Sequence, residues 1–206
     1  MNEAGLIGAG VSSMHLGFRL LAAGFDVTLY AQRRPEDMEA ARLQNSVSHQ
    51  YDTVQRERAL GIDFWNETNC RVALGHNHWL QAPGMESLEF WGSFDGYGKC
   101  VDYRMYIPRL MREFESRGGR IEYRDVGAAD IDALAERHAV LAVGVGKGKR
   151  GLADFFPRQD ELSRHREPAP LICCGVYEGV RDTDPLGVTI SISAGHGELI
   201  VLPMEN

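Results

Sequence analysis

The sequence predicts an α/β protein in which a parallel βαβ unit comes first and a β-rich segment interrupts the elements that follow it. Two observations predict this fold class. Residues 4–32 have the pattern of strand, glycine turn, helix and strand, and strands alternate with amphipathic helices again over residues 101–147. Between these parts, residues 76–94 alternate apolar and polar side chains as strands of a second layer do.

The first strand and helix surround a glycine-rich turn. The apolar run of residues 4–7 ends in Gly8 and Gly10, and apolar residues then recur at helical spacing until Gly24 ends the helix. The β-forming run of residues 26–32 completes the unit.

This order fits a dinucleotide-binding turn. Gly8 can adopt the strained turn, and Gly10 lets the backbone approach a pyrophosphate. The amides of Val11, Ser12 and Ser13 begin the helix and offer donors at the positive end of its dipole. Ser13 stands where the fingerprint has a third glycine for close helix–strand packing, and a small serine fits there at modest cost. A glycine turn without a nucleotide is the alternative.

The end of the second strand departs from the fingerprint, because an acidic residue usually stands there and binds the ribose hydroxyls. Here the residues are Gln32, Arg33 and Arg34. Gln32 can hydrogen-bond a ribose, but without charge assistance. The two arginines leave a phosphorylated ribose, and hence NADP, open.

The later elements do not simply repeat the βαβ unit. In chain order they are a polar connection into a helix at 42–65, strands at 76–94, an amphipathic helix at 101–119, a strand at 120–126, a helix at 129–139, a strand at 140–147, and two strands at 188–193 and 198–202 around a turn.

Composition limits the classes of function. The chain has 206 residues and a net charge of −7, which offers no basic field for nucleic acid. It has no leader pattern and no run of about 18 apolar residues, so we expect a cytoplasmic protein without a membrane partner. The four cysteines form no metal-type pair and predict reduced, mostly buried thiols.

Five stretches together resemble the styrene and indole monooxygenase family, the two-component flavin monooxygenases. They are IGAGVSSMHLG at 7–17, RLQNSVSHQYDTVQRE at 42–57, VDYRMYIPRLM at 101–111, VGVGK at 143–147 and SAGHGELIVLP at 193–203. The resemblance covers almost all of residues 4–203 and corresponds to the family's N-terminal half.

The resemblance implies a Rossmann-like FAD-binding domain of the hydroxylase-type flavoprotein fold, with an inserted β-sheet substrate domain and the fold's C-terminal part missing. The FAD-binding domain is expected at 1–70 and 99–165, and part of the substrate domain at 71–98 and 166–206. Because the family's later Gly-Asp segment is absent, we expect a catalyst that is incomplete alone. Self-association, or a C-terminal half supplied by another chain, would then complete the sheet.

The resemblance further implies an oxygenase component. A separate NADH-dependent flavin reductase supplies reduced FAD, and oxygen then gives a flavin hydroperoxide that oxygenates indole or a small aromatic alkene such as styrene. Because the flavin is the oxygen donor, the side chains position and shield it. An NAD(P)-dependent oxidoreductase and a non-catalytic flavin-binding fragment are the alternatives.

The family's motifs also assign roles to residues. The cofactor-binding set is Gly8, Gly10, Ser12, Ser13, Arg42, Arg104, Gly144 and Gly146, in which the arginines contact phosphates and the last two glycines let a strand end approach FAD. Asn45, Val47 and His49 are expected near the isoalloxazine and substrate. His49 is a candidate general acid, and a hydrogen-bonded structural histidine is the alternative.

Other residues carry weaker hypotheses. His76 and His78 would share one face of a strand, but no third ligand is evident, so no metal is expected. Residues 147–150, KGKR, are either a solvated loop or a phosphate clamp. Five aromatic residues could line an apolar pocket, although most are expected in an ordinary core: Tyr51, Trp65, Trp79, Phe90 and Trp91.

Overall fold

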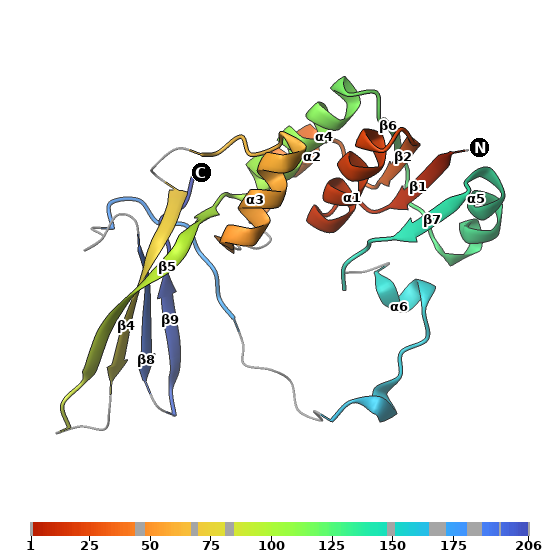
Figure 1. Ribbon diagram of the computed structural model, residues 1–206. Helices are drawn as coiled ribbons and strands as arrows, with labels where there is room; N and C mark the ends of the chain where they lie inside the picture. The colour runs from red at the N-terminus through yellow and green to blue at the C-terminus, as the bar shows by residue number, and fades with distance from the viewer. Residues whose placement is uncertain are drawn as a thin grey trace. The chain divides into compact units, whose positions relative to one another are not determined.

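The computed structural model of the chain describes residues 2–43, 48–66, 70–80, 85–147, 151–164, 172–180, 187–193 and 195–205. It contains two compact units, one formed by residues 1–42 with 104–174 and the other by residues 43–103 with 175–206 (Figure 1). The division into a FAD-binding and a substrate domain, with the bounds expected above, stays a prediction.

The first unit is built on a four-stranded sheet with the strand order β6–β2–β1–β7. Its strands are β1 (Glu3–Ile7), β2 (Asp26–Ala31), β6 (Arg120–Tyr123) and β7 (Val140–Val143). Every pair in it is parallel, and α1 (Val11–Ala22) connects β1 to β2, which confirms the predicted βαβ unit. The carboxyl ends of the four strands therefore lie at one edge, where open α/β sheets bind ligands.

Neighbouring β1 residues point to opposite faces of this sheet, and helices cover both faces. On one face, α1 packs against α4 (Tyr103–Ser116), with the rings of Phe18 and Phe114 edge to face at 5.8 Å. On the other face, Ile7 and Tyr30 share a buried cluster with Leu134 of α5 (Ile131–Arg137). The shorter elements are α2 (Pro35–Glu39), η2 (Ala128–Asp130), α6 (Leu152–Phe155) and η3 (Asp160–Leu162).

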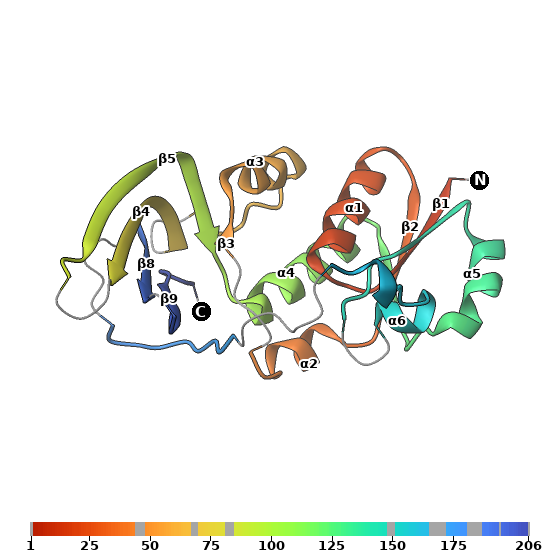
Figure 2. The same ribbon diagram turned by 90° about the horizontal axis from the view of Figure 1, so that it is seen from below.

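The second unit contains a five-stranded sheet with the order β3–β5–β4–β8–β9. Its strands are β3 (Ser48–His49), β4 (Arg71–Leu80), β5 (Leu88–Cys100), β8 (Gly187–Ser193) and β9 (Gly197–Val201). β4 and β8 are parallel, and the other pairs are antiparallel. The helix α3 (Tyr51–Leu60) packs against β5 (Figure 2). The predicted second layer of strands and the final hairpin are confirmed.

The aromatic side chains of this unit are not the ordinary core that the sequence suggested. Tyr51, Trp79, Phe90 and Trp91 are each at least 40% exposed, and Trp65 is half-buried. Apolar alternation predicts a sheet face but not what covers it. Among the described residues of the unit, one helix packs on the sheet, and Trp79, Phe90 and Trp91 of β4 and β5 stay exposed.

The expectation of buried thiols is confirmed for two of the four cysteines and wrong for the other two. Cys70 and Cys100 are buried, whereas Cys173 and Cys174 are exposed in a segment without helix or strand. Burial raises the pKa of the Cys100 thiol to about 12. Within the described residues, no helix has both the length and the apolar character needed to cross a membrane.

A buried hydrogen bond joins β2 to the residue that follows α5. The hydroxyl oxygen of Tyr30 lies 2.8 Å from Nε2 of His138, with the two rings edge to face. Burial is the largest cause that raises the pKa of Tyr30 and lowers the pKa of His138. The hydrogen bond therefore joins a protonated tyrosine hydroxyl to a neutral imidazole.

His138 should make the first unit less stable in acid. Because burial lowers its pKa below the ordinary value of 6.5, the unfolded chain binds the proton first, and the free energy of unfolding falls as the pH drops below that value. We expect the melting temperature to fall more in the wild type than in His138→Gln between about pH 8 and about pH 5.5. Equal falls in the two proteins would contradict this assignment.

Candidate functional site

The candidate site lies at the carboxyl edge of the parallel sheet, where β1 turns into α1. Gly8 has a φ of 98°, which residues with side chains rarely adopt, and its amide donates to the Tyr30 carbonyl at 2.9 Å. Gly10 is the N-cap of α1, and its carbonyl accepts from Met14 at 3.0 Å. No acidic residue stands in the first turn of α1, so the field of its amides and dipole favours an anion.

The end of β7 closes on this turn at backbone distance. The Gly144 amide donates to the Ile7 carbonyl at 2.8 Å, and a Cβ atom placed on Gly8 would lie 2.8 Å from the Gly144 oxygen. By contrast, among the described residues, a Cβ on Gly10 would meet only that oxygen within 4 Å, at 3.8 Å, and one on Gly146 would meet nothing. Gly8 and Gly144 thus serve the fold, while Gly10 and Gly146 leave space open.

Ser13 is accommodated because its neighbour has no side chain. It is buried, and a Cβ on Gly144 would overlap the Ser13 hydroxyl oxygen. The space that the fingerprint obtains from a third glycine in the helix is provided here by a glycine at the end of β7. The sequence contains both sides of this contact, Ser13 and the VGVGK run, but the dinucleotide-binding fingerprint does not connect the two.

Three further residues that were predicted to bind the cofactor belong to the first unit. Ser12 is exposed beside the turn, Arg42 is exposed after α2, and Arg104 is half-buried in the first turn of α4. Their contacts with a pyrophosphate stay predictions. Asn45, Val47 and residues 148–150 of the KGKR run lie outside the described residues.

A carboxylate does lie beside the carboxyl end of β2, where the fingerprint expects one, but it comes from the segment that follows another strand. Gln32 donates through Nε2 to Oδ1 of Asp125 at 2.6 Å. Asp125 follows β6, which pairs with β2, so the register brings the two strand ends together. Arg34 instead lies over the Tyr123 ring, 4.4 Å from its centre. Sequence reasoning missed Asp125 because the strand order was not known.

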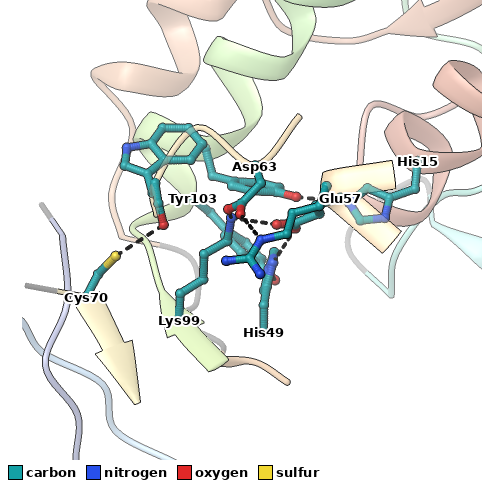
Figure 3. A network of polar contacts seen from close by, with 10 residues as sticks. His15, His49, Glu57, Asp63, Cys70, Lys99 and Tyr103 are labelled. Atoms are coloured by element: carbon teal, nitrogen blue, oxygen red, sulfur yellow. Dashed lines mark hydrogen bonds and ion pairs between the residues drawn. The ribbon is translucent and has the colours of Figure 1, made fainter. Parts of the chain in front are cut away.

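His49 belongs to a buried polar network in the second unit (Figure 3). Its Nδ1 lies 2.7 Å from Oε1 of Glu57, whose other oxygen is 2.5 Å from the Lys99 ammonium. Lys99 also pairs with Asp63 at 2.6 Å, and both Lys99 and Glu57 are fully buried. The hydrogen-bonded histidine that the sequence left open is therefore present, and a catalytic role stays a prediction.

His76 and His78 share one face of β4, as predicted. Their rings stack at 6.4 Å, and His76 also stacks on Trp91 at 4.0 Å. His76 Nε2 lies 2.6 Å from a Glu89 carboxylate oxygen. Within the described part of the chain, no group of three or more metal-ligating side chains is found.

Comparisons with known proteins agree with this geometry. Residues 148–206 match the family described as "Styrene monooxygenase A putative substrate binding domain". Styrene monooxygenase StyA of Pseudomonas fluorescens is 38% identical over 199 residues, which cover 97% of this chain and 47% of the relative. StyA of a Pseudomonas sp has the same identity and coverage. The chain therefore spans about half the length of the curated relatives it matches.

A solved structure matches almost the whole chain. A mutant of PqsL from P. aeruginosa superimposes with a TM-score of 0.60 at 14% identity, over 99% of this chain and 58% of that chain. The fold class is thus the α/β hydroxylase-type flavoprotein fold with a β-sheet domain. Within that class, the resemblance to the styrene and indole monooxygenase family is confirmed over 97% of the chain.

The Ser13–Gly144 contact predicts non-additive changes in stability. Gly144→Ala should lower the melting temperature because the new methyl group overlaps the Ser13 hydroxyl. Ser13→Gly removes the overlapping atoms, so the double variant should be more stable than Gly144→Ala alone. Thermal unfolding of the four proteins measures this cycle. Additive effects of the two substitutions would show that overlap with the Ser13 hydroxyl does not cause the loss of stability in Gly144→Ala.

Proposed function

We propose that this chain provides the FAD-binding part and some of the substrate-binding part of an oxygenase component of a two-component flavin monooxygenase. The observation that carries the proposal is 38% identity to styrene monooxygenase StyA over 97% of the chain. The glycine turn at the β1 end supports it independently, because its geometry suits a dinucleotide.

The residues of the turn fit the pyrophosphate of FAD. Gly10 and Gly146 leave room for a ligand to approach the backbone, and the amides of Val11, Ser12 and Ser13 point from the start of a twelve-residue helix. Arg42 and Arg104 belong to the same unit and would add charge-assisted hydrogen bonds. The turn itself would thus both bind the cofactor and fix its direction on the sheet.

The groups at the carboxyl end of β2 favour an unphosphorylated ribose. Asp125 beside Gln32 offers the carboxylate that ribose hydroxyls prefer, and it would repel a 2′-phosphate. Arg34, one of the two arginines that left NADP open, stacks on Tyr123. This arrangement supports FAD over an NADP-dependent oxidoreductase.

Reduced FAD, when bound, would supply the oxygen-transferring chemistry after reaction with O2. The protein would bind and orient it and exclude water around the reacting atoms. We propose that an NADH-dependent flavin reductase supplies it and that a small aromatic compound such as styrene or indole is the substrate. Asn45, Val47 and His49 stay the residues expected near the ring system and substrate.

The relatives are about twice as long as this chain, so we propose the activity for a protein that includes the remainder, in the same chain or in a second one. Self-association through β9, at one end of its sheet, is the alternative way to cover that strand. A cytoplasmic location is proposed on redox grounds, because none of the four cysteines, all of which are described, forms a disulfide.

Gly10→Val should abolish FAD binding and leave the fold intact. The new side chain has room within the protein but occupies the space into which the pyrophosphate must come. Fluorescence titration should show FAD affinity lowered by at least about tenfold, with an unchanged melting temperature. Gly92→Val, at a glycine of the second unit that also has open space, is the matched control and should bind FAD normally. Wild-type affinity in Gly10→Val would place the cofactor elsewhere.

Activity should require the remainder of the enzyme. We expect the 206-residue chain, given FAD, NADH and a flavin reductase, to consume NADH with little styrene oxide or indigo formed, because an open site loses peroxide to water. Adding a polypeptide that corresponds to the unmatched half of StyA should raise the product formed per NADH. No product from styrene or indole even then would refute the monooxygenase proposal.

A further inference from the structure

The network around His49 is organised by a buried lysine. Lys99 of β5 is fully buried, and its ammonium lies between Glu57 Oε2 at 2.5 Å and Asp63 Oδ1 at 2.6 Å. A buried ammonium is tolerated only when paired, so both acids are held as carboxylates. Arg58 also pairs with Asp63, at 2.9 Å. Two carboxylates and two cations thus take part in these ion pairs.

The ion pair with Lys99 keeps Glu57 ionised, and this fixes which nitrogen of His49 carries hydrogen. An ionised carboxylate has no hydrogen to donate, so Glu57 Oε1 can only accept from His49 Nδ1 at 2.7 Å. Nδ1 therefore keeps its hydrogen whether the ring is neutral or charged. Nε2 is the nitrogen at which a proton can arrive or leave.

Tyr103 faces that nitrogen. Its hydroxyl oxygen lies 3.4 Å from His49 Nε2, with the rings edge to face at 6.1 Å. Burial, and to a lesser degree the charge of Glu57, raise the pKa of Tyr103, so its hydroxyl keeps its hydrogen and donates it. A bond of this length is weak, and another group can replace it at Nε2.

We propose that Glu57, held as a carboxylate by Lys99, is a positioning residue: it turns His49 so that Nε2 faces the Tyr103 hydroxyl, and it leaves that nitrogen as the one that gains or loses a proton. One proton arriving at or leaving Nε2 changes the ring by one positive charge, while Nδ1–H and its bond to Glu57 persist in both states. The use of this proton in the reaction rests on the proposed function, whereas the tautomer does not.

Nitrogen NMR of protein labelled with 15N-histidine tests the tautomer directly. The signal of His49 is assigned by its loss in His49→Gln. We expect the neutral ring to show a protonated Nδ1 and an unprotonated Nε2, the minor form of free imidazole. A protonated Nε2 in the neutral ring of the wild type would overturn the proposal, whatever the variants do.

Variants of Glu57 test its role in the same spectrum. Glu57→Gln replaces an obligate acceptor by a group that can also donate, so we expect a mixture of tautomers, while Glu57→Asp should restore Nδ1–H. Asp52→Asn removes an exposed carboxylate from the same helix and is the matched control. If Glu57→Gln folds and keeps the wild-type tautomer, Glu57 does not position the ring. If it does not fold, the wild-type spectrum and Glu57→Asp decide.

Kinetics of the reconstituted enzyme separate this proposal from the proposed function. Glu57→Gln should lower kcat by at least about tenfold with little change in FAD affinity, and Glu57→Asp should recover part of the loss. An unchanged kcat in Glu57→Gln, in an enzyme that still forms product, would refute the positioning role alone. Absence of product in the wild type would refute the proposed function and leave the tautomer result standing.

Discussion

The structure of the first unit depends on the approach of two stretches of backbone at the carboxyl edge of its sheet. The turn after β1 and the end of β7 come so close that a Cβ on Gly8 or on Gly144 would collide with the other segment. Ser13 uses the space that Gly144 leaves, so α1 begins directly above the strand ends. The direction of the helix amides, and with it any nucleotide site, follows from this contact.

The second unit uses charge where the first uses close packing. Burying Lys99 requires two carboxylates beside it, and these come from α3 and from the segment that follows it. The ion pairs hold that helix against β5 and leave one oxygen of Glu57 for His49. A buried ion pair is a costly way to stabilise a fold, but it permits few other arrangements of the groups that it joins. The position of His49 is thus set both by its contact with Glu57 and by the pairing of β3 with β5.

The sequence predicted the features that depend on local pattern. The βαβ unit, the amphipathic helix α4 and the final hairpin follow from periodicity and turn residues within short windows. Contacts between distant residues could not be predicted in this way. Asp125 lies 93 residues from Gln32 and reaches it only because β6 pairs with β2. Similarly, nothing local indicates that Lys99 is buried with Glu57, or that Trp91 is exposed.

Hydrogen–deuterium exchange with and without FAD tests the central claim most directly, because it reads the amides that would bind the pyrophosphate. The account predicts slower exchange on FAD addition in peptides that contain residues 8–13 and 144–146, and no such change with NADPH. Unchanged exchange at the β1 turn, or protection confined to the second unit, would contradict the claim that the Gly8–Gly144 approach builds a flavin site.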